Sequence, residues 1–96
     1  MDEWGPSVWS EFHHFAVSPP SDRQAIVTFY TSTIPSKIQC YACTEKYTRL
    51  LIKFPIPEDT VELFEWTVHI HNVVNLMLRK PLMSIDEARA LYNVSI

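Results

Sequence analysis

Residues 66–81 read WTVHIHNVVNLMLRKP, and this stretch decides the fold class. Apolar residues recur in it at helical spacing, and the polar residues His71 and Asn75 share one face with Leu78 at positions i, i+4 and i+7. Acidic residues precede the stretch and a proline ends it, as is typical of the two ends of a helix. The pattern predicts one long helix from about residue 58 to residue 80.

Outside this helix, prolines divide the chain into four shorter helical segments. The first follows Pro6, and we expect the second to end at Pro35. Ser84 and Glu87 have the spacing of a capping box at the start of the last segment. The only glycine, Gly5, leaves little material for the tight hairpins of a β-sheet. We therefore expect an all-α fold in one domain spanning residues 1–96. The four segments cover residues 6–18, 23–33, 40–53 and 84–92.

Composition excludes several classes of partner. The 96 residues carry a net charge of -3 without a basic stripe, so we expect no nucleic-acid partner. Charged and polar residues interrupt the apolar stretch at residues 61–78, which excludes a membrane span. Residues 1–4 lack the basic and apolar regions of a signal peptide. We therefore expect a soluble, cytoplasmic protein.

Cys40 and Cys43 form a C-x-x-C pair at the start of the predicted helix over residues 40–53. Unpaired amide groups and the dipole at a helix start stabilise a thiolate, which suits such a pair to thiol exchange. Two other interpretations stay open on this motif alone. The thiols are also suitable zinc ligands, and they could be inert residues of the core.

Two polar stripes on separate helices add to the cysteine pair. Trp9 and His13 lie at i and i+4 on the first predicted helix, as His71 and Asn75 do on the long one. If both stripes face one cavity near the cysteines, they line it with an aromatic plate, two imidazoles and an amide. Such a cavity suits a flat heteroaromatic cofactor with polar edges. Each of these residues taken singly is also typical of an ordinary helix core.

The other two histidines bear on the zinc interpretation. His14 and His69 lie off these stripes, and we interpret them as peripheral. His69 and His71 are two residues apart, so they do not face the same way on a helix. The alternative function that stays open is a helical zinc-binding or non-catalytic interaction module that uses Cys40, Cys43 and histidines.

The motifs together resemble the Erv/ALR family of FAD-linked sulfhydryl oxidases, and most of all the short versions encoded by large DNA viruses. Their order and spacing hold along nearly the whole chain. The motifs are Trp4-Gly5, Trp9 with His13, Cys40-x-x-Cys43, and HNVVNLMLRKP at residues 71–81. The resemblance implies a four-helix bundle with a short fifth helix, which binds FAD at one end of the bundle and forms a homodimer.

The resemblance also implies a set of cofactor contacts and an electron path. Substrate thiols would exchange with Cys40, and Cys43 would pass the electrons to FAD and then to O2, which gives H2O2. The implied partner is a protein thiol, such as that of a thioredoxin-like protein, in the host cytoplasm or the virion. The implied FAD contacts are Trp4, Gly5, Trp9, His13, His71, Asn72, Asn75, Leu78, Lys80 and Tyr92.

Two departures from the family pattern are visible in the sequence. The family often has a histidine three residues after the second cysteine, and this chain has Lys46 there. Larger members carry a separate shuttle C-x-x-C and a structural cysteine pair, whereas this sequence contains 2 cysteines in all. Every electron would therefore have to enter through the pair Cys40 and Cys43.

Overall fold

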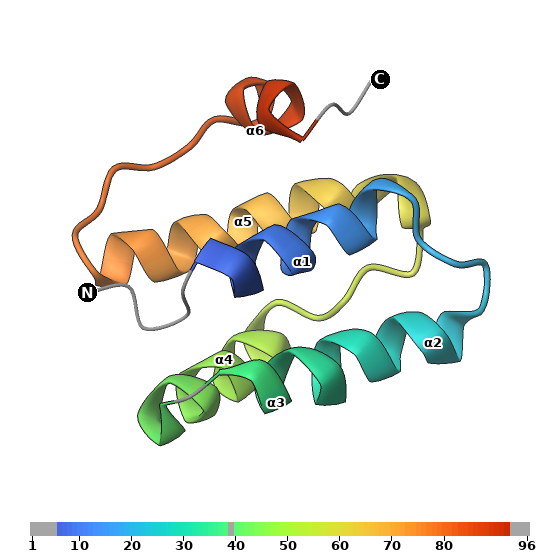
Figure 1. Cartoon of the computed structure of the whole chain (residues 1–96), viewed down its shortest axis with the longest axis horizontal. Coiled ribbons are helices and arrows are strands. Elements are labelled where there is room, and N and C mark those ends of the chain that lie inside the picture. The colour runs from blue at the N-terminus through green and yellow to red at the C-terminus, as the bar shows by residue number, and fades with distance from the viewer. Residues whose placement is uncertain (1–5, 39, 93–96) are drawn as a thin grey trace.

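The computed structural model describes residues 6–38 and 40–92, and every regular element in those ranges is helical. The predicted all-α fold is confirmed for this part of the chain, which Figure 1 shows. No helix in these ranges is long and apolar enough to cross a lipid bilayer. The elements are α1 (Pro6–Val17), α2 (Arg23–Thr28), the π-helical turn η1 (Phe29–Thr33), α3 (Ile34–Lys37), α4 (Tyr41–Lys53), the 3-10 turn η2 (Thr60–Glu62), α5 (Leu63–Met77) and α6 (Ile85–Leu91).

Four helical rods form a bundle, and the short helix α6 lies over α5 (Figure 1). α1 runs beside α5, and the continuous rod α2–η1–α3 lies with α4 on the other side of the bundle. Contacts join α1 to both α5 and α3. The first turn of α4 and the last turn of α5 lie at the same end of the bundle. This is the four-helix bundle with a short fifth helix that the family resemblance implies.

Aromatic side chains make up much of the shared hydrophobic core. Phe12, Tyr30 and Tyr47 are fully buried, and Trp66 is nearly so. The rings of Phe12 and Tyr30 meet edge to face, with centroids 5.1 Å apart and planes at 82°, an arrangement that aromatic pairs favour. The indole N–H of Trp66 donates to the Phe54 carbonyl at 2.9 Å, so this polar group is satisfied as it enters the core.

The second helical segment is longer than the sequence pattern predicts. The prediction that it ends at Pro35 is wrong, because the helix continues through α3 to Lys37. A π-helical turn precedes the proline, and the Ile34 N–H bonds there to the Phe29 carbonyl, five residues back. This wider turn relieves the clash that a proline ring makes with the carbonyl of the preceding α-helical turn. Pro35 consequently lies in the first turn of α3.

The long helix ends two to three residues earlier than predicted. α5 stops at Met77, and the chain then turns through Arg79, whose φ of 58° is left-handed. The Lys80 N–H bonds to the Asn75 carbonyl at 2.8 Å, and the Arg79 N–H bonds to the Leu76 carbonyl at 3.2 Å. This is the Schellman arrangement, in which glycine usually takes the left-handed position. In a chain with a single glycine, an arginine takes it instead.

The capping box predicted at the start of α6 is confirmed. The Glu87 N–H donates to the Ser84 hydroxyl oxygen, and the Ser84 N–H donates to the Glu87 carboxylate, both at 3.1 Å. Hydrogen bonds from the Ser84 backbone and hydroxyl lower the pKa of the exposed Glu87 carboxyl. The reciprocal pair fixes where the last helix begins.

Candidate functional site

The two cysteines occupy the start of α4, as predicted. Cys40 is the N-cap residue, and its Sγ accepts the backbone N–H of Cys43 at 3.3 Å. The Cys40 carbonyl accepts both the backbone N–H and the hydroxyl of Thr44, at 3.0 and 3.1 Å. Cys40 is half-buried, whereas Cys43 is 3% exposed. The helix start therefore holds the more accessible sulfur where amide groups stabilise a thiolate.

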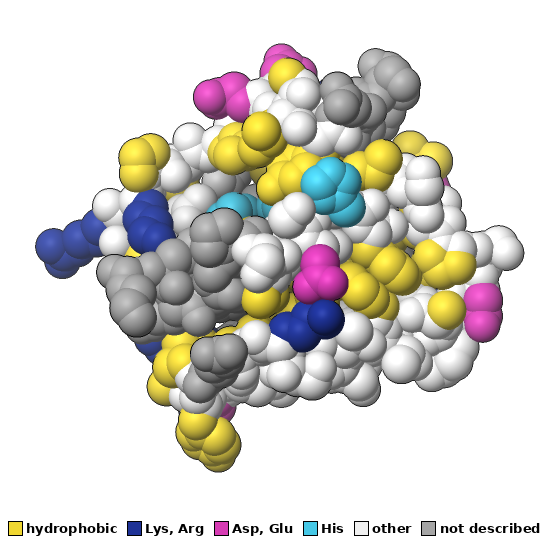
Figure 2. Space-filling model, in the orientation of Figure 1, with side chains coloured by type: hydrophobic (Ala, Val, Ile, Leu, Met, Phe, Trp, Pro, Cys, Tyr) yellow, Lys and Arg dark blue, Asp and Glu magenta, His cyan; other side chains and the backbone are white. Residues whose placement is uncertain are grey.

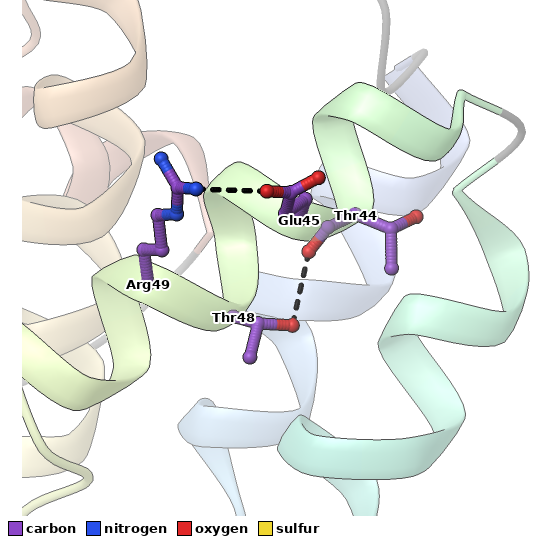
Figure 3. Close-up of polar contacts among 4 residues, drawn as sticks. All are labelled: Thr44, Glu45, Thr48 and Arg49. Carbon is purple, nitrogen blue, oxygen red and sulfur yellow. Dashed lines mark hydrogen bonds and ion pairs between the residues drawn. The ribbon is translucent and has the colours of Figure 1, made fainter.

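The outer face of α4 carries ordinary helix-stabilising contacts (Figure 3). The Thr48 hydroxyl donates to the Thr44 carbonyl at 3.0 Å, and Arg49 pairs with Glu45 at 2.8 Å, one turn apart. Because Arg49 and Glu45 are exposed, such a pair contributes only about 0.3–0.5 kcal/mol to the free energy of unfolding. Cys43 lies on the inner face of α4 instead, beside a pocket.

This pocket lies between α4 and α5 at one end of the bundle, and its lining is mostly apolar. Leu78, a site residue implied by the family resemblance, belongs to the α5 wall. Lys46 belongs to the α4 wall, so the position where the family often has histidine shares the pocket with the Cys43 thiol. The lining residues are Cys43, Lys46, Tyr47, Leu50, Val74, Met77 and Leu78.

The two polar stripes meet between α1 and α5. Nε2 of His13 lies 2.8 Å from Nδ1 of His71, so the structure brings the two predicted imidazoles into contact. The Trp9 indole stacks on His71 with ring centroids 3.6 Å apart and planes at 7°. Nδ1 of His13 lies 2.9 Å from the hydroxyl oxygen of Thr67, which is fully buried. These four residues form one connected cluster, named here the histidine cluster.

The surroundings of His13 hold its ring neutral. His13 is 2% exposed, and burial lowers its pKa to about 3, with smaller effects from His71 and His14. The Tyr92 ring packs against His13 at a centroid distance of 4.9 Å and against His14 at 4.8 Å. Burial raises the pKa of the Tyr92 hydroxyl. The rings of Phe12, Phe64 and Tyr92 surround His13, so this part of the site is aromatic and weakly polar. Figure 2 shows histidine at the surface of this face of the molecule, beside hydrophobic side chains.

The two asparagines of α5 have different surroundings. The Asn72 amide donates to the Met83 carbonyl at 2.7 Å, and its oxygen accepts the Met83 N–H at 2.9 Å. Asn75 is half-buried, and its side chain makes no hydrogen bond to any residue that the structure describes. Asn72 therefore ties the segment before α6 to α5, whereas the Asn75 amide has no such bond within the described residues. As cofactor contacts, both stay predictions.

The remaining predicted contacts lie at the same end of the bundle or outside the described residues. Lys80 is half-buried and directly follows the left-handed turn after α5. Figure 2 shows Lys and Arg side chains at the end of the molecule where α5 terminates. Trp4 and Gly5 lie outside the described residues.

Thr67 was not predicted from the sequence, although it belongs to the histidine cluster. It stands four residues before His71, so the two share a face of α5. This spacing was the only signal available, because a threonine in a helix carries no chemical signature of its own. Its contact with His13, which is 54 positions away along the chain, becomes visible only in the fold.

His14 and His69 are peripheral, as predicted. His14 is exposed, with its Nδ1 near the hydroxyl and carbonyl of Ser10 on the same helix, and the exposed His69 packs against the Phe54 ring. The described ranges include both cysteines and all four histidines, and no group of three or more His, Cys, Asp or Glu side chains there could hold a metal ion.

A helical bundle with a C-x-x-C dithiol at one helix start, and with a histidine and tryptophan cluster between two of its helices, defines a class of small helical redox proteins. The sequence profile of the Erv1 / Alr family matches residues 6–93. The chain belongs to this family, and the resemblance seen in the sequence is confirmed.

Viral proteins are similar to this chain over most of its length. A putative FAD-linked sulfhydryl oxidase of Invertebrate iridescent virus 6 is 31% identical over 98 residues, which cover 90% of this chain and 88% of that protein. An FAD-linked sulfhydryl oxidase of African swine fever virus (isolate Pig/Kenya/KEN-50/1950) is 29% identical over 102 residues, which cover 100% and 85%. A probable FAD-linked sulfhydryl oxidase of Acanthamoeba polyphaga mimivirus is 29% identical over 96 residues, and the match covers 91% of this chain but 66% of that protein.

Proposed function

We propose that this chain is an FAD-linked sulfhydryl oxidase that forms disulfide bonds in protein substrates. One observation carries the proposal. The half-buried Cys40 and the buried Cys43 lie at a helix start, and Cys43 lines a pocket whose other wall is α5. The same helix carries His71 and Asn75, about two turns and one turn before Leu78 of the pocket, which supports a shared site for the dithiol and the cofactor.

The residues at this end fit a flavin cofactor by their chemistry. A flat ring system needs apolar walls with a few polar groups at its edges, and the pocket supplies those walls through Leu78 and its neighbours. The half-buried Asn75 amide has no hydrogen bond to a described residue and can serve such an edge. We propose that Trp9, His13, His71, Asn75, Leu78 and Lys80 hold FAD, with Trp4, Gly5, Asn72 and Tyr92 as further contacts.

The exposure of the two sulfurs supports a division of their tasks. In the oxidised enzyme, a substrate thiolate attacks Sγ of Cys40, the sulfur–sulfur bond to Cys43 breaks, and Cys43 leaves as a thiolate. A second substrate thiolate attacks the substrate sulfur of this mixed disulfide, forms the product disulfide and releases Cys40. The enzyme pair then holds the two electrons and the substrate has lost two protons. Bound FAD would supply the acceptor for that electron pair and pass it to O2, which yields H2O2.

The proposed function also includes a protein substrate, a homodimer and a location in the host cytoplasm or the virion. A protein dithiol, such as that of a thioredoxin-like partner, would dock at Cys40, because Cys40 is the more accessible of the two cysteines. The protein would act as a homodimer in the host cytoplasm or the virion. The viral relatives support the viral character of the protein.

Purification followed by an oxygen-electrode assay tests this function. We expect yellow protein with FAD bound to each chain, which consumes O2 and releases H2O2 when dithiothreitol is added. Cys40→Ser should keep the flavin and lose turnover with a protein substrate, while Thr48→Ser on the outer face of α4 should behave as wild type. Colourless protein with stoichiometric zinc would replace the proposal by the zinc-binding alternative. Bound flavin without O2 consumption would indicate a non-catalytic module.

A further inference from the structure

Within the histidine cluster, the position of Thr67 decides which atom donates and which atom accepts in each hydrogen bond. The Thr67 hydroxyl donates to the Phe64 carbonyl at 2.6 Å. Because a threonine hydroxyl has one hydrogen, its oxygen can only accept from Nδ1 of His13, which lies 2.9 Å away. His13 therefore carries a hydrogen on Nδ1.

The direction then continues to His71. Burial lowers the pKa of His13 to about 3, so its neutral ring has a lone pair on Nε2. This Nε2 lies 2.8 Å from Nδ1 of His71, so Nδ1 of His71 is the donor in that contact. While the His71 ring is neutral, its Nε2 is consequently a hydrogen-bond acceptor. The stack with Trp9 fixes the plane of the ring, so the tautomer alone decides whether its outer edge accepts or donates.

We propose that Thr67 is a positioning residue for the cofactor: it sets the tautomers of His13 and His71 and so gives His71 an acceptor nitrogen for an N–H group of the flavin nucleotide. The inference rests on the proposed function, which places His71 at the cofactor. FAD suits such an acceptor, because its flavin ring and its adenine ring each carry N–H donors at an edge.

Removal of the Thr67 hydroxyl should reverse the direction of the hydrogen bond between His13 and His71. In Thr67→Val, which keeps the shape of the side chain, Nδ1–H of His13 loses its acceptor. A buried donor without a partner is unfavourable, so the hydrogen of His13 moves to Nε2. His13 then donates to Nδ1 of His71, and the hydrogen of His71 moves to its Nε2. The edge that accepted a hydrogen bond now donates one.

Long-range proton–nitrogen NMR correlations of the histidine rings test this directly in the purified protein. Wild type and Thr67→Ser should show hydrogen on Nδ1 of both rings, and Thr67→Val should show hydrogen on Nε2 of both. Thr67→Ala and Thr67→Ser form a second pair that differs by the hydroxyl alone. This pair gives the same test if the valine variant folds poorly. Nε2-protonated rings in wild type, or Nδ1-protonated rings in the variants without hydroxyl, would overturn the proposal.

Flavin affinity provides the second readout. Thr67→Val should raise the dissociation constant of FAD about tenfold, the effect of one lost hydrogen bond, and Thr67→Ser should stay within about twofold of wild type. Reversed tautomers with wild-type flavin affinity would refute a positioning role. Wild-type protein that binds no flavin would refute the proposed function instead, and the tautomers would still show whether Thr67 sets the direction.

Discussion

The Tyr47 hydroxyl donates to the Tyr30 carbonyl at 2.5 Å. It thereby supplies a donor to a backbone carbonyl that receives none from its own helix. Within a π-helical turn this carbonyl would accept from the residue five positions on, which is Pro35 and has no N–H. The Ile34 N–H bonds to Phe29 instead. Tyr47 lies one turn after Cys43 on α4, so this bond also fixes the helix of the dithiol against the rod α2–η1–α3.

Tyr47→Phe should lower the free energy of unfolding by about 1–3 kcal/mol, because it leaves a buried carbonyl without a donor. Urea denaturation measures this. Tyr41, which is 85% exposed, provides the matched control, and Tyr41→Phe should change stability by less than about 0.5 kcal/mol. Equal effects of the two variants would contradict the role given to Tyr47.

Arg79→Gly should stabilise the protein by about 0.5–1 kcal/mol. A side chain with a Cβ costs about 1–2 kcal/mol in the left-handed region, and glycine loses part of that gain through its greater freedom in the unfolded chain. Arg79→Ala keeps the Cβ and should show no comparable gain in urea denaturation. A destabilised glycine variant would mean that the Arg79 side chain, rather than the turn, matters most here.

Substitution of Asn72 should mainly lower stability, whereas substitution of Asn75 should mainly weaken flavin binding. Asn72→Ala removes two hydrogen bonds to Met83 and should lower the free energy of unfolding by about 2 kcal/mol, at about 1 kcal/mol for each bond. Its flavin affinity should fall by less than that of Asn75→Ala, because the Asn72 amide already bonds to the Met83 backbone. Asn75→Ala should instead weaken flavin binding about tenfold, with little effect on the stability of the flavin-free protein. Thermal unfolding and flavin titration of both variants measure the two effects, and the reverse assignment would exchange the roles of these residues.

His13 should make the protein less stable in acid. Its pKa falls from 6.5 in the unfolded chain to about 3 in the fold, so between these values the unfolded chain binds the additional proton. The free energy of unfolding therefore falls as the pH falls through this window, by up to about 1.4 kcal/mol per pH unit. The ionisable neighbours of His13 are His71 on α5, Tyr92 beyond α6 and His14 on α1.

Urea denaturation at pH 7 and at pH 5 measures this contribution. Wild type should lose about 2 kcal/mol more than His13→Gln between the two pH values, because glutamine does not titrate. The matched control His14→Gln changes an exposed residue and should keep the wild-type dependence. If His13→Gln showed that dependence as well, another group would cause the loss in acid.

Features set by neighbouring residues in the chain could be predicted from the sequence. The capping box of Ser84 and Glu87 is a contact across three positions, and the shared face of His71, Asn75 and Leu78 follows from helical periodicity. Both depend on one helix at a time, so no knowledge of the packing was needed. The family motifs added the relation between these helices and the cysteine pair.

Features set by contacts between helices could not be predicted in this way. In the sequence, Pro35 indicates the end of a helix. Only the π-helical turn and the hydrogen bond from the Tyr47 hydroxyl explain why the helix continues. Thr67 acquires its role through His13 on another helix. The left-handed turn at Arg79 was also unexpected, because arginine rarely takes that conformation.

In the proposed function, electrons leave the substrate through Cys40 and Cys43 and reach a bound flavin. The most direct measurement is the visible absorption of the purified protein after dithiothreitol is added without oxygen. The flavin band of the wild type should bleach and return when air is admitted, whereas Cys43→Ser should keep its flavin and its band unbleached. A flavin that bleaches equally fast in Cys43→Ser, or a wild type whose flavin does not respond to the dithiol, would contradict the account.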